Sequence, residues 1–202
     1  PRYHSARRMM VNKYDHEACT MSYPGMVSVK WVHGYCTKDG GKVYASNSQE
    51  CTLAGGSWTK ATDQCCTSTM AYLFADGHVM TAEEEEEVFK FTDPFRHEGD
   101  TIKLLPSEKV NLTRSYKVLM TKNSDADVLT KRIKALVNQY CDTLGIIFRE
   151  EELNEKIRDL EGVVLLYPLI STGDFRTAEH QYLSLDRLQI QFESDPDVMM
   201  TH

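Results

Sequence analysis

The chain has 202 residues, of which 41% are hydrophobic and 26% are charged, and its formal net charge is −7. These proportions are typical of a folded globular protein of one domain or two unequal ones, and they exclude wholesale disorder. The negative charge argues against a protein that grips nucleic-acid backbone, and no apolar run approaches the ~20 residues that cross a bilayer.

The first predicted element is a short basic helix over residues 5–14, in which Ala6, Met9 and Met10 recur at helical spacing. A helix this short is marginal alone, so we expect it to dock on another surface. The leading Pro1 and the lack of an apolar signal core fit a cytosolic product, although a matured secreted chain would look the same. The redox compartment therefore stays open.

Short strand patterns dominate the chain up to residue 106. Val27, Val29 and Trp31 alternate with polar residues, which predicts a half-buried strand. Asp76-Gly77 lies between two apolar segments and predicts a hairpin. The acidic run Glu83–Glu87 predicts a solvated surface, with a cation-binding or lumen-lining role as the alternative. Further short strands are predicted over 42–45, 88–92 and 101–105.

Cysteines concentrate in this first part, because five of the six lie between residues 19 and 66. A disulfide between Cys36 and Cys51 would close a local loop and contribute up to ~3 kcal/mol. Cys65 or Cys66 would then pair with Cys19 or with a neighbour. The region would be a cross-linked loop and not an active site.

Two other states of these thiols stay open. Zinc held by His33, Cys36, Cys51 and either Cys65 or Cys66 is one alternative, although only His33 and Cys36 have knuckle-like spacing. Free, partly buried thiols are the other. The nucleophile elbow, the phosphate-binding loop, the dinucleotide fingerprint and the His-Glu-x-x-His motif are all missing. The sequence thus predicts no catalytic residue, no enzymatic activity and no cofactor.

Candidate partner contacts are large side chains near the N-terminus and in the Cys-rich region. They are Tyr3, Met9, Met10, Trp31 and Trp58. The plainer alternative for Trp58 is that it covers a small loop core after the Gly55-Gly56 turn.

Helical periodicity begins after Pro106. A strand with Tyr116 and Val118 is followed by a predicted helix over 125–143, with Ser124 as its N-cap and Gly145 at its C-terminal end. The apolar face of that helix comprises Leu129, Ile133, Leu136, Val137, Tyr140 and Leu144.

Three more elements complete the second half. A helix is predicted from Glu150 to about Gly162, with Leu153 and Ile157 on its apolar face. The apolar run 163–166 predicts a buried strand. Leu188, Ile190 and Phe192 alternate with polar residues, which predicts a strand with one wet face.

The predicted fold class is α+β in three parts. Residues 1–24 form an N-terminal helix or arm. Residues 25–106 form a mostly β, barrel-like part with a Cys-rich loop insertion over 33–66. Residues 107–202 form a compact β-α-α-β-β unit.

The first half resembles proteins of tailed-bacteriophage virions. Residues 5–14, followed by 17–21, are similar to the start of small head-to-tail connector proteins, although Asp15 stands where those proteins have glycine. The β-rich stretch through 98–103 would suit the β-barrel of those connectors. The Cys51-x-x-x-Gly-Gly-x-Trp58 pattern is similar to Cys-Gly-Gly-Trp loops of phage and bacterial surface proteins.

The second half resembles other proteins of the same particles. Residues 164–168 and 186–192 are similar to segments of tail-completion and tail-terminator subunits. The stretches 149–153 and 161–163 also resemble part of baseplate wedge proteins.

These resemblances imply a non-enzymatic structural protein of a tailed-phage virion, made in the host cytoplasm. The implied position is a neck or tail ring that mediates assembly and DNA passage. The implied partners are other virion proteins and copies of the same chain in a ring, with DNA passing nearby without specific binding and no membrane. A baseplate component and a secreted, disulfide-stabilised binding module are the alternatives.

Overall fold

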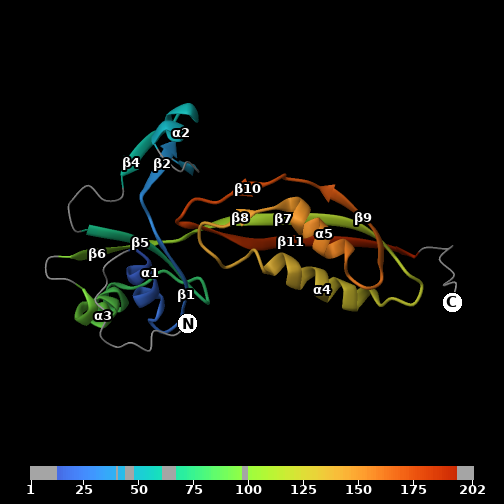
Figure 1. Ribbon diagram of the computed structural model, residues 1–202, viewed down its shortest axis with the longest axis horizontal. Helices are drawn as coiled ribbons and strands as arrows, with labels where there is room; N and C mark the ends of the chain where they lie inside the picture. The colour runs from blue at the N-terminus through green and yellow to red at the C-terminus, as the bar shows by residue number, and fades with distance from the viewer. Residues whose placement is uncertain (1–12, 40, 44–47, 61–66, 97–99, 195–202) are drawn as a thin grey trace. The chain divides into compact units, whose positions relative to one another are not determined.

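The structure is a computed structural model that describes residues 13–39, 41–43, 48–60, 67–96 and 100–194 (Figure 1). The chain forms two compact units. Unit 1 comprises residues 1–109, 142–146 and 176–182, and unit 2 comprises 110–141, 147–175 and 183–202. The sequence places residues 107–202 in one continuous part. Two segments of this part, residues 142–146 and 176–182, are grouped with unit 1.

Unit 1 begins with helix α1 (Lys13–Met21) and contains two three-stranded sheets. The first sheet has the order β1-β5-β6, in which β1 (Met26–Trp31) is antiparallel to β5 (Thr67–Phe74) and β6 (Thr101–Pro106) is parallel to β5. The second sheet has the order β3-β2-β4, with β2 at Gly34–Lys38, β3 at Gly41–Val43 and β4 at Ser57–Lys60. No sheet among the described residues closes into a barrel, so the barrel-like prediction is wrong.

Strand β5 is the core strand of unit 1 because both of its faces are covered. Met70, Tyr72 and Phe74 lie in one hydrophobic cluster, while Ala71 and Leu73 lie in a second cluster. The first cluster also contains Val88 of helix α3 (Ala82–Thr92) and side chains of β1 and β6, and the second contains Leu144. Burial on both faces explains the continuous apolar sequence of this strand.

Strand β1 differs from its predicted pattern at one residue. Met26 pairs with Phe74 and Ser28 pairs with Leu73, so Val27 is the extra residue of a β-bulge. The bulge changes the alternation, and Val27 is exposed while Val29 is buried.

The acidic run is helical, which corrects two predictions. Residues 78–81 form no second hairpin strand, and residues 88–92 belong to α3. The helix starts at a capping box, in which the Glu84 backbone N–H donates to Thr81 Oγ1 and the Thr81 N–H donates to the Glu84 carboxylate. Carboxylates in the first turn are favoured by the helix dipole, so this local chemistry selects a helix. A 3-10 turn, η1 (Asp93–Phe95), follows.

Unit 2 is built on a sheet of order β11-β7-β9, with β7 at Glu108–Met120, β9 at Val163–Ile170 and β11 at Gln181–Ser194. Helix α4 (Ala126–Asn138) packs against helix α5 (Glu150–Arg158), and α5 packs against β9. Two short strands, β8 (Ile147–Phe148) and β10 (Phe175–Arg176), form a separate pair. This order contains the predicted β-α-α-β-β succession, and the α+β class is confirmed.

Helix α4 has the predicted buried face, but its ends differ. Leu129, Ile133 and Val137 are buried. The N-cap is Asp125, whose carboxylate accepts hydrogen bonds from two backbone N–H groups of the first turn, and not the predicted Ser124. The helix ends at Asn138, well before Gly145, because the chain then turns back into unit 1.

A buried ion pair joins three segments of unit 2. The Arg114 guanidinium in β7 donates to Glu150 Oε1 at 2.8 Å and to Thr172 Oγ1 at 2.8 Å, and it lies 4.4 Å from the Phe148 ring centre. The side chain of Arg114 is fully buried. Burial also raises the pKa of the neighbouring Tyr116 to about 12.

The other carboxylate oxygen of Glu150 holds the loop that follows β9. It accepts hydrogen bonds from Ser171 Oγ at 2.8 Å, from the Thr172 N–H at 3.1 Å and from the Gly173 N–H. The Glu150 N–H in turn donates to Asp174 Oδ1 at 2.8 Å. One residue at the start of α5 thus positions both the loop and the arginine.

We predict that Arg114→Met destabilises unit 2 by about 3–5 kcal/mol, because it leaves the Glu150 carboxylate buried without its cation. Urea unfolding followed by circular dichroism measures the change. The matched control is Arg158→Met, which removes the exposed partner of Glu151 and should cost less than about 1 kcal/mol. Equal effects of the two substitutions would contradict the role of the buried pair.

Candidate interaction surface

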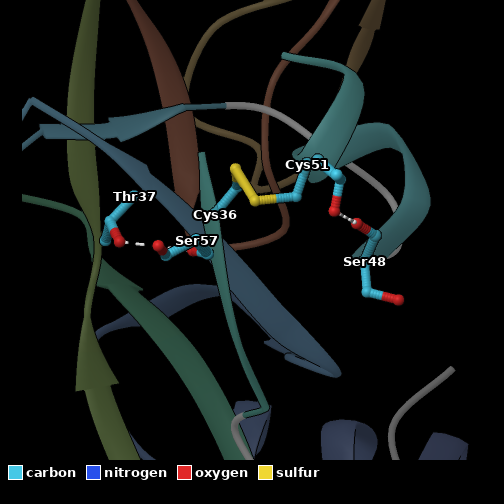
Figure 2. Close-up of a disulfide and its surroundings, with 6 residues drawn as sticks. Cys36, Thr37, Ser48, Cys51 and Ser57 are labelled. Atoms are coloured by element: carbon cyan, nitrogen blue, oxygen red, sulfur yellow. Dashed lines mark hydrogen bonds between the residues drawn. A yellow bond between two sulfur atoms is a disulfide. The ribbon is translucent and has the colours of Figure 1, made fainter. Parts of the chain in front are cut away.

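The structure brings together three of the predicted site residues. Cys36 of β2 and Cys51 of helix α2 (Ser48–Leu53) form a disulfide, and Trp58 of β4 packs against it (Figure 2). This bond occupies two thiols that the zinc alternative requires. The nearby His33 ring instead lies 3.0 Å from the Glu179 carboxylate.

The remaining predicted contacts are dispersed or outside the described residues. Trp31 is half-buried against the core of unit 1, and its ring makes an edge contact with His16. The backbone N–H of Trp31 donates to Glu17 Oε1 at 2.7 Å. Trp31 is therefore packed within unit 1. The predicted sites that lie outside the described residues are Tyr3, Met9, Met10, Cys65 and Cys66.

Among the residues that the structure describes, no group of three or more His, Cys, Asp or Glu side chains is arranged to hold a metal ion. No helix within the described ranges has the length and apolar character of a membrane span. A pocket of about 420 Å³ beside the start of α4 is lined by Asn123, Asp125, Arg132 and Glu161, among others. Asp125 also caps helix α4 there.

The most distinctive surface of unit 2 is strand β9. Its sequence is Val-Val-Leu-Leu-Tyr-Pro-Leu-Ile, which contains no charge. We expected residues 163–166 to form a buried strand, but of these four residues only Leu166 is buried. Leu165, Tyr167 and Leu169 are 46%, 50% and 50% exposed, and Ile170 is 40% exposed.

The register of the sheet explains which side chains are exposed. Leu165 pairs with Leu119 and Tyr167 pairs with Lys117, and directly opposed residues share one face of a sheet. On the opposite face, Val118 and Leu166 are paired and buried. β9 is at the edge of the sheet, which is where a strand interrupted by Pro168 belongs.

The same open face becomes polar away from β9. Lys117 forms an ion pair with Glu193 of β11 at 2.9 Å, which places Glu193 on this face. Gln189 and Gln191 precede Glu193 at every second position of the strand, so they lie on the same face, and both are exposed. The open face thus combines an apolar strip on β9 with a polar margin on β11, and this composition is typical of a protein interface. We call the exposed side chains Leu165, Tyr167 and Leu169 the β9 strip. Leu169 lies at a β-bulge, because Tyr116 pairs with Pro168 and Ser115 pairs with Ile170.

Comparisons with known proteins bear on the fold. No protein-family model matches the sequence, and no curated protein matches it either. Among solved structures, the chain is similar to one in the cryo-EM structure of the anti-feeding prophage baseplate, six-fold symmetrised. The TM-score is 0.56 and the sequence identity is 10%, with 90% of this chain covered. This chain spans 38% of the length of that chain. At this identity, the likeness is one of fold.

A histidine in unit 1 connects the turn after β5 to the capping box of α3. His78 Nδ1 lies 2.6 Å from Asp76 Oδ1, and Nε2 lies 3.2 Å from Glu84 Oε1. The imidazole stacks on Phe74 at 4.2 Å. The hydrogen bond to Asp76 raises the pKa of His78, and the same bond lowers the pKa of Asp76. The hydrogen bond from the Thr81 N–H lowers the pKa of Glu84 most, and the nearby His78 lowers it further.

These shifts predict a pH window for this contact. The raised pKa of His78 means that its contribution is complete below the unfolded value of about 6.5 and is lost as the pH rises through the folded value. The lowered pKa of Asp76 means that its contribution is complete above about 3.9 and is lost in more acidic solution. The stabilisation should therefore be greatest between about pH 4 and 6.5.

An NMR titration of the His78 ring protons tests this window. The midpoint should lie above about 6.5 in the wild type and should move toward that value in Asp76→Asn. His78→Gln should remove the pH-dependent stability difference between about pH 6 and 9. A wild-type midpoint at or below the ordinary histidine value would contradict the assignment.

Proposed function

We propose that this chain is a non-enzymatic structural component of a tailed, phage-like particle, at the level of its baseplate. The observation that carries the proposal is the similarity of fold to the anti-feeding prophage baseplate chain over 90% of this chain. The resemblance of residues 149–153 and 161–163 to baseplate wedge proteins favours the same position. The partners would be other subunits of the particle and further copies of this chain around its axis.

The β9 strip is the surface that we assign to contact with a neighbouring subunit. Its three side chains are each about half exposed, so each has apolar area left to bury. The strip carries no charge, whereas the whole chain has a net charge of −7, so apposition of this surface avoids the repulsion that the rest of the protein would cause. Burial of the exposed parts would contribute about 1 kcal/mol for each side chain.

A neck position with passing DNA was implied by the connector resemblance. That resemblance depends on a β-barrel, and the sheets of the described residues are open. We therefore propose the baseplate in preference to the neck. The disulfide favours a secreted binding module as the second candidate, because such bonds persist in oxidising surroundings.

The test is incorporation of tagged chain into purified particles. Leu165→Ser/Tyr167→Ser should reduce incorporation about 30-fold, because the loss of about 2 kcal/mol of burial weakens the contact by that factor. The matched control is Gln189→Ser/Gln191→Ser, which changes the polar margin of the same sheet and should assemble normally. Circular dichroism of the isolated variants checks that both remain folded.

Electron microscopy of labelled particles decides the position. A label at the distal end of the tail supports the baseplate proposal. A label at the head-to-tail junction supports the neck, and particles that lack the chain altogether favour the secreted module. Equal incorporation of both double variants would contradict the role of the β9 strip.

A further inference from the structure

Residues 34–60 form a small substructure within unit 1, which we call the disulfide module. It contains β2, β3, α2 and β4, and among the described residues these elements contact chiefly one another. Cys36 pairs with Val43 on one side of β2 and with Trp58 on the other, so the disulfide starts from the central strand. Figure 2 shows it joining that strand to α2.

The two sulfurs are the centre of this module. Cys36 and Cys51 are both fully buried and form a small hydrophobic cluster, against which the partly buried Trp58 packs. Leu53 and Ala54, two further hydrophobic side chains of the module whose burial the structure describes, are exposed. A three-stranded sheet of short strands and a helix of six residues are too small to be stable without such a core.

Two glycines show how closely the backbone surrounds this core. A Cβ atom at Gly56 would lie 2.5 Å from Cys36 Sγ and 3.1 Å from Cys51 Sγ. A Cβ atom at Gly34 would lie 2.4 Å from the Trp58 ring. The backbone is thus packed directly on the disulfide and on the indole, with no other side chain between them.

The rest of unit 1 has its own core. The two hydrophobic clusters around β5 contain no residue of the module. The chain enters the module just after Val32, which is fully buried, and His33, whose N–H donates to Glu179 at 2.9 Å. These contacts fix the point where the module begins whether or not the module is folded.

We propose that the Cys36–Cys51 disulfide is a redox switch for local folding. In the oxidised state, β2, β3, α2 and β4 are folded, and in the reduced state these four elements unfold while the sheet β1-β5-β6 stays intact. Reduction by a dithiol proceeds by thiol–disulfide exchange. One thiolate of the reductant attacks a sulfur of the bond, which forms a mixed disulfide and releases the other cysteine as a thiolate. The second thiolate of the reductant then attacks the reductant's sulfur in the mixed disulfide and releases the second cysteine thiolate. The reductant becomes a disulfide, and Cys36 and Cys51 gain two electrons and two protons as thiols.

This switch would make the surface of the module available only after oxidation. That surface includes Leu53, which is 88% exposed and lies at the end of α2. A chain in reducing cytosol would have an unfolded segment at residues 34–60, and the segment would fold when the chain reaches an oxidising environment.

Hydrogen exchange measured by mass spectrometry tests the switch on the full chain. The background is Cys65→Ser/Cys66→Ser, so that Cys36 and Cys51 are the only cysteines between residues 34 and 66. Full reduction by dithiothreitol, verified by alkylation of Cys36 and Cys51, should accelerate exchange in β2 and β4 at least about tenfold. Exchange in β5 should change less than about twofold, and removal of the reductant with reoxidation should restore protection in the module.

A second variant separates the bond from the reductant. Cys36→Ser/Cys51→Ser should show the reduced pattern without any dithiothreitol. Two results would overturn the proposal. Protection of β2 and β4 that survives complete reduction would mean that the module is stable without the disulfide. Loss of protection in β5 as well would mean that the effect is global.

Discussion

The ion pair between Arg114 and Glu150 is the constraint on which unit 2 depends. An arginine in the central strand of a sheet is buried only at a high desolvation cost, and the pair offsets this cost by full hydrogen bonding of the carboxylate. The carboxylate belongs to the first residue of α5, so the same contact sets where that helix begins relative to β7. It also fixes the loop after β9, and thereby the end of the exposed strand.

Much of unit 2 could be predicted from the sequence because its periodicity is local. The helical spacing of Leu129 and Ile133, and of Leu153 and Ile157, identifies α4 and α5, and all four residues are buried. The ion pair could not be predicted in this way. Arg114 and Glu150 are 36 residues apart, and neither residue type signals burial on its own. The disulfide is different, since its 15-residue separation makes closure local and Cys36–Cys51 was the favoured pair.

The errors of prediction have identifiable causes. The run Glu83–Glu87 was interpreted only as a charged surface. Thr81 and Glu84 have the spacing of a capping box, which indicates a helix start. In β9, the continuous apolar run suggested burial on both faces, although Pro168 indicated an edge strand. The β9 strip was missed for this reason. An uninterrupted apolar strand can be either a core strand or an interface strand, and only its position in the sheet decides between them.

The edge position of β9 also has a consequence for the isolated chain. A strand of eight uncharged residues at the edge of a sheet is a template for the addition of strands from other chains, which is the first step of aggregation. Pro168 lacks an N–H group and interrupts such a ladder at one point. The residues of β9 before it carry no charged side chain that would oppose pairing with another strand. Aggregation of the isolated chain would therefore begin at this edge.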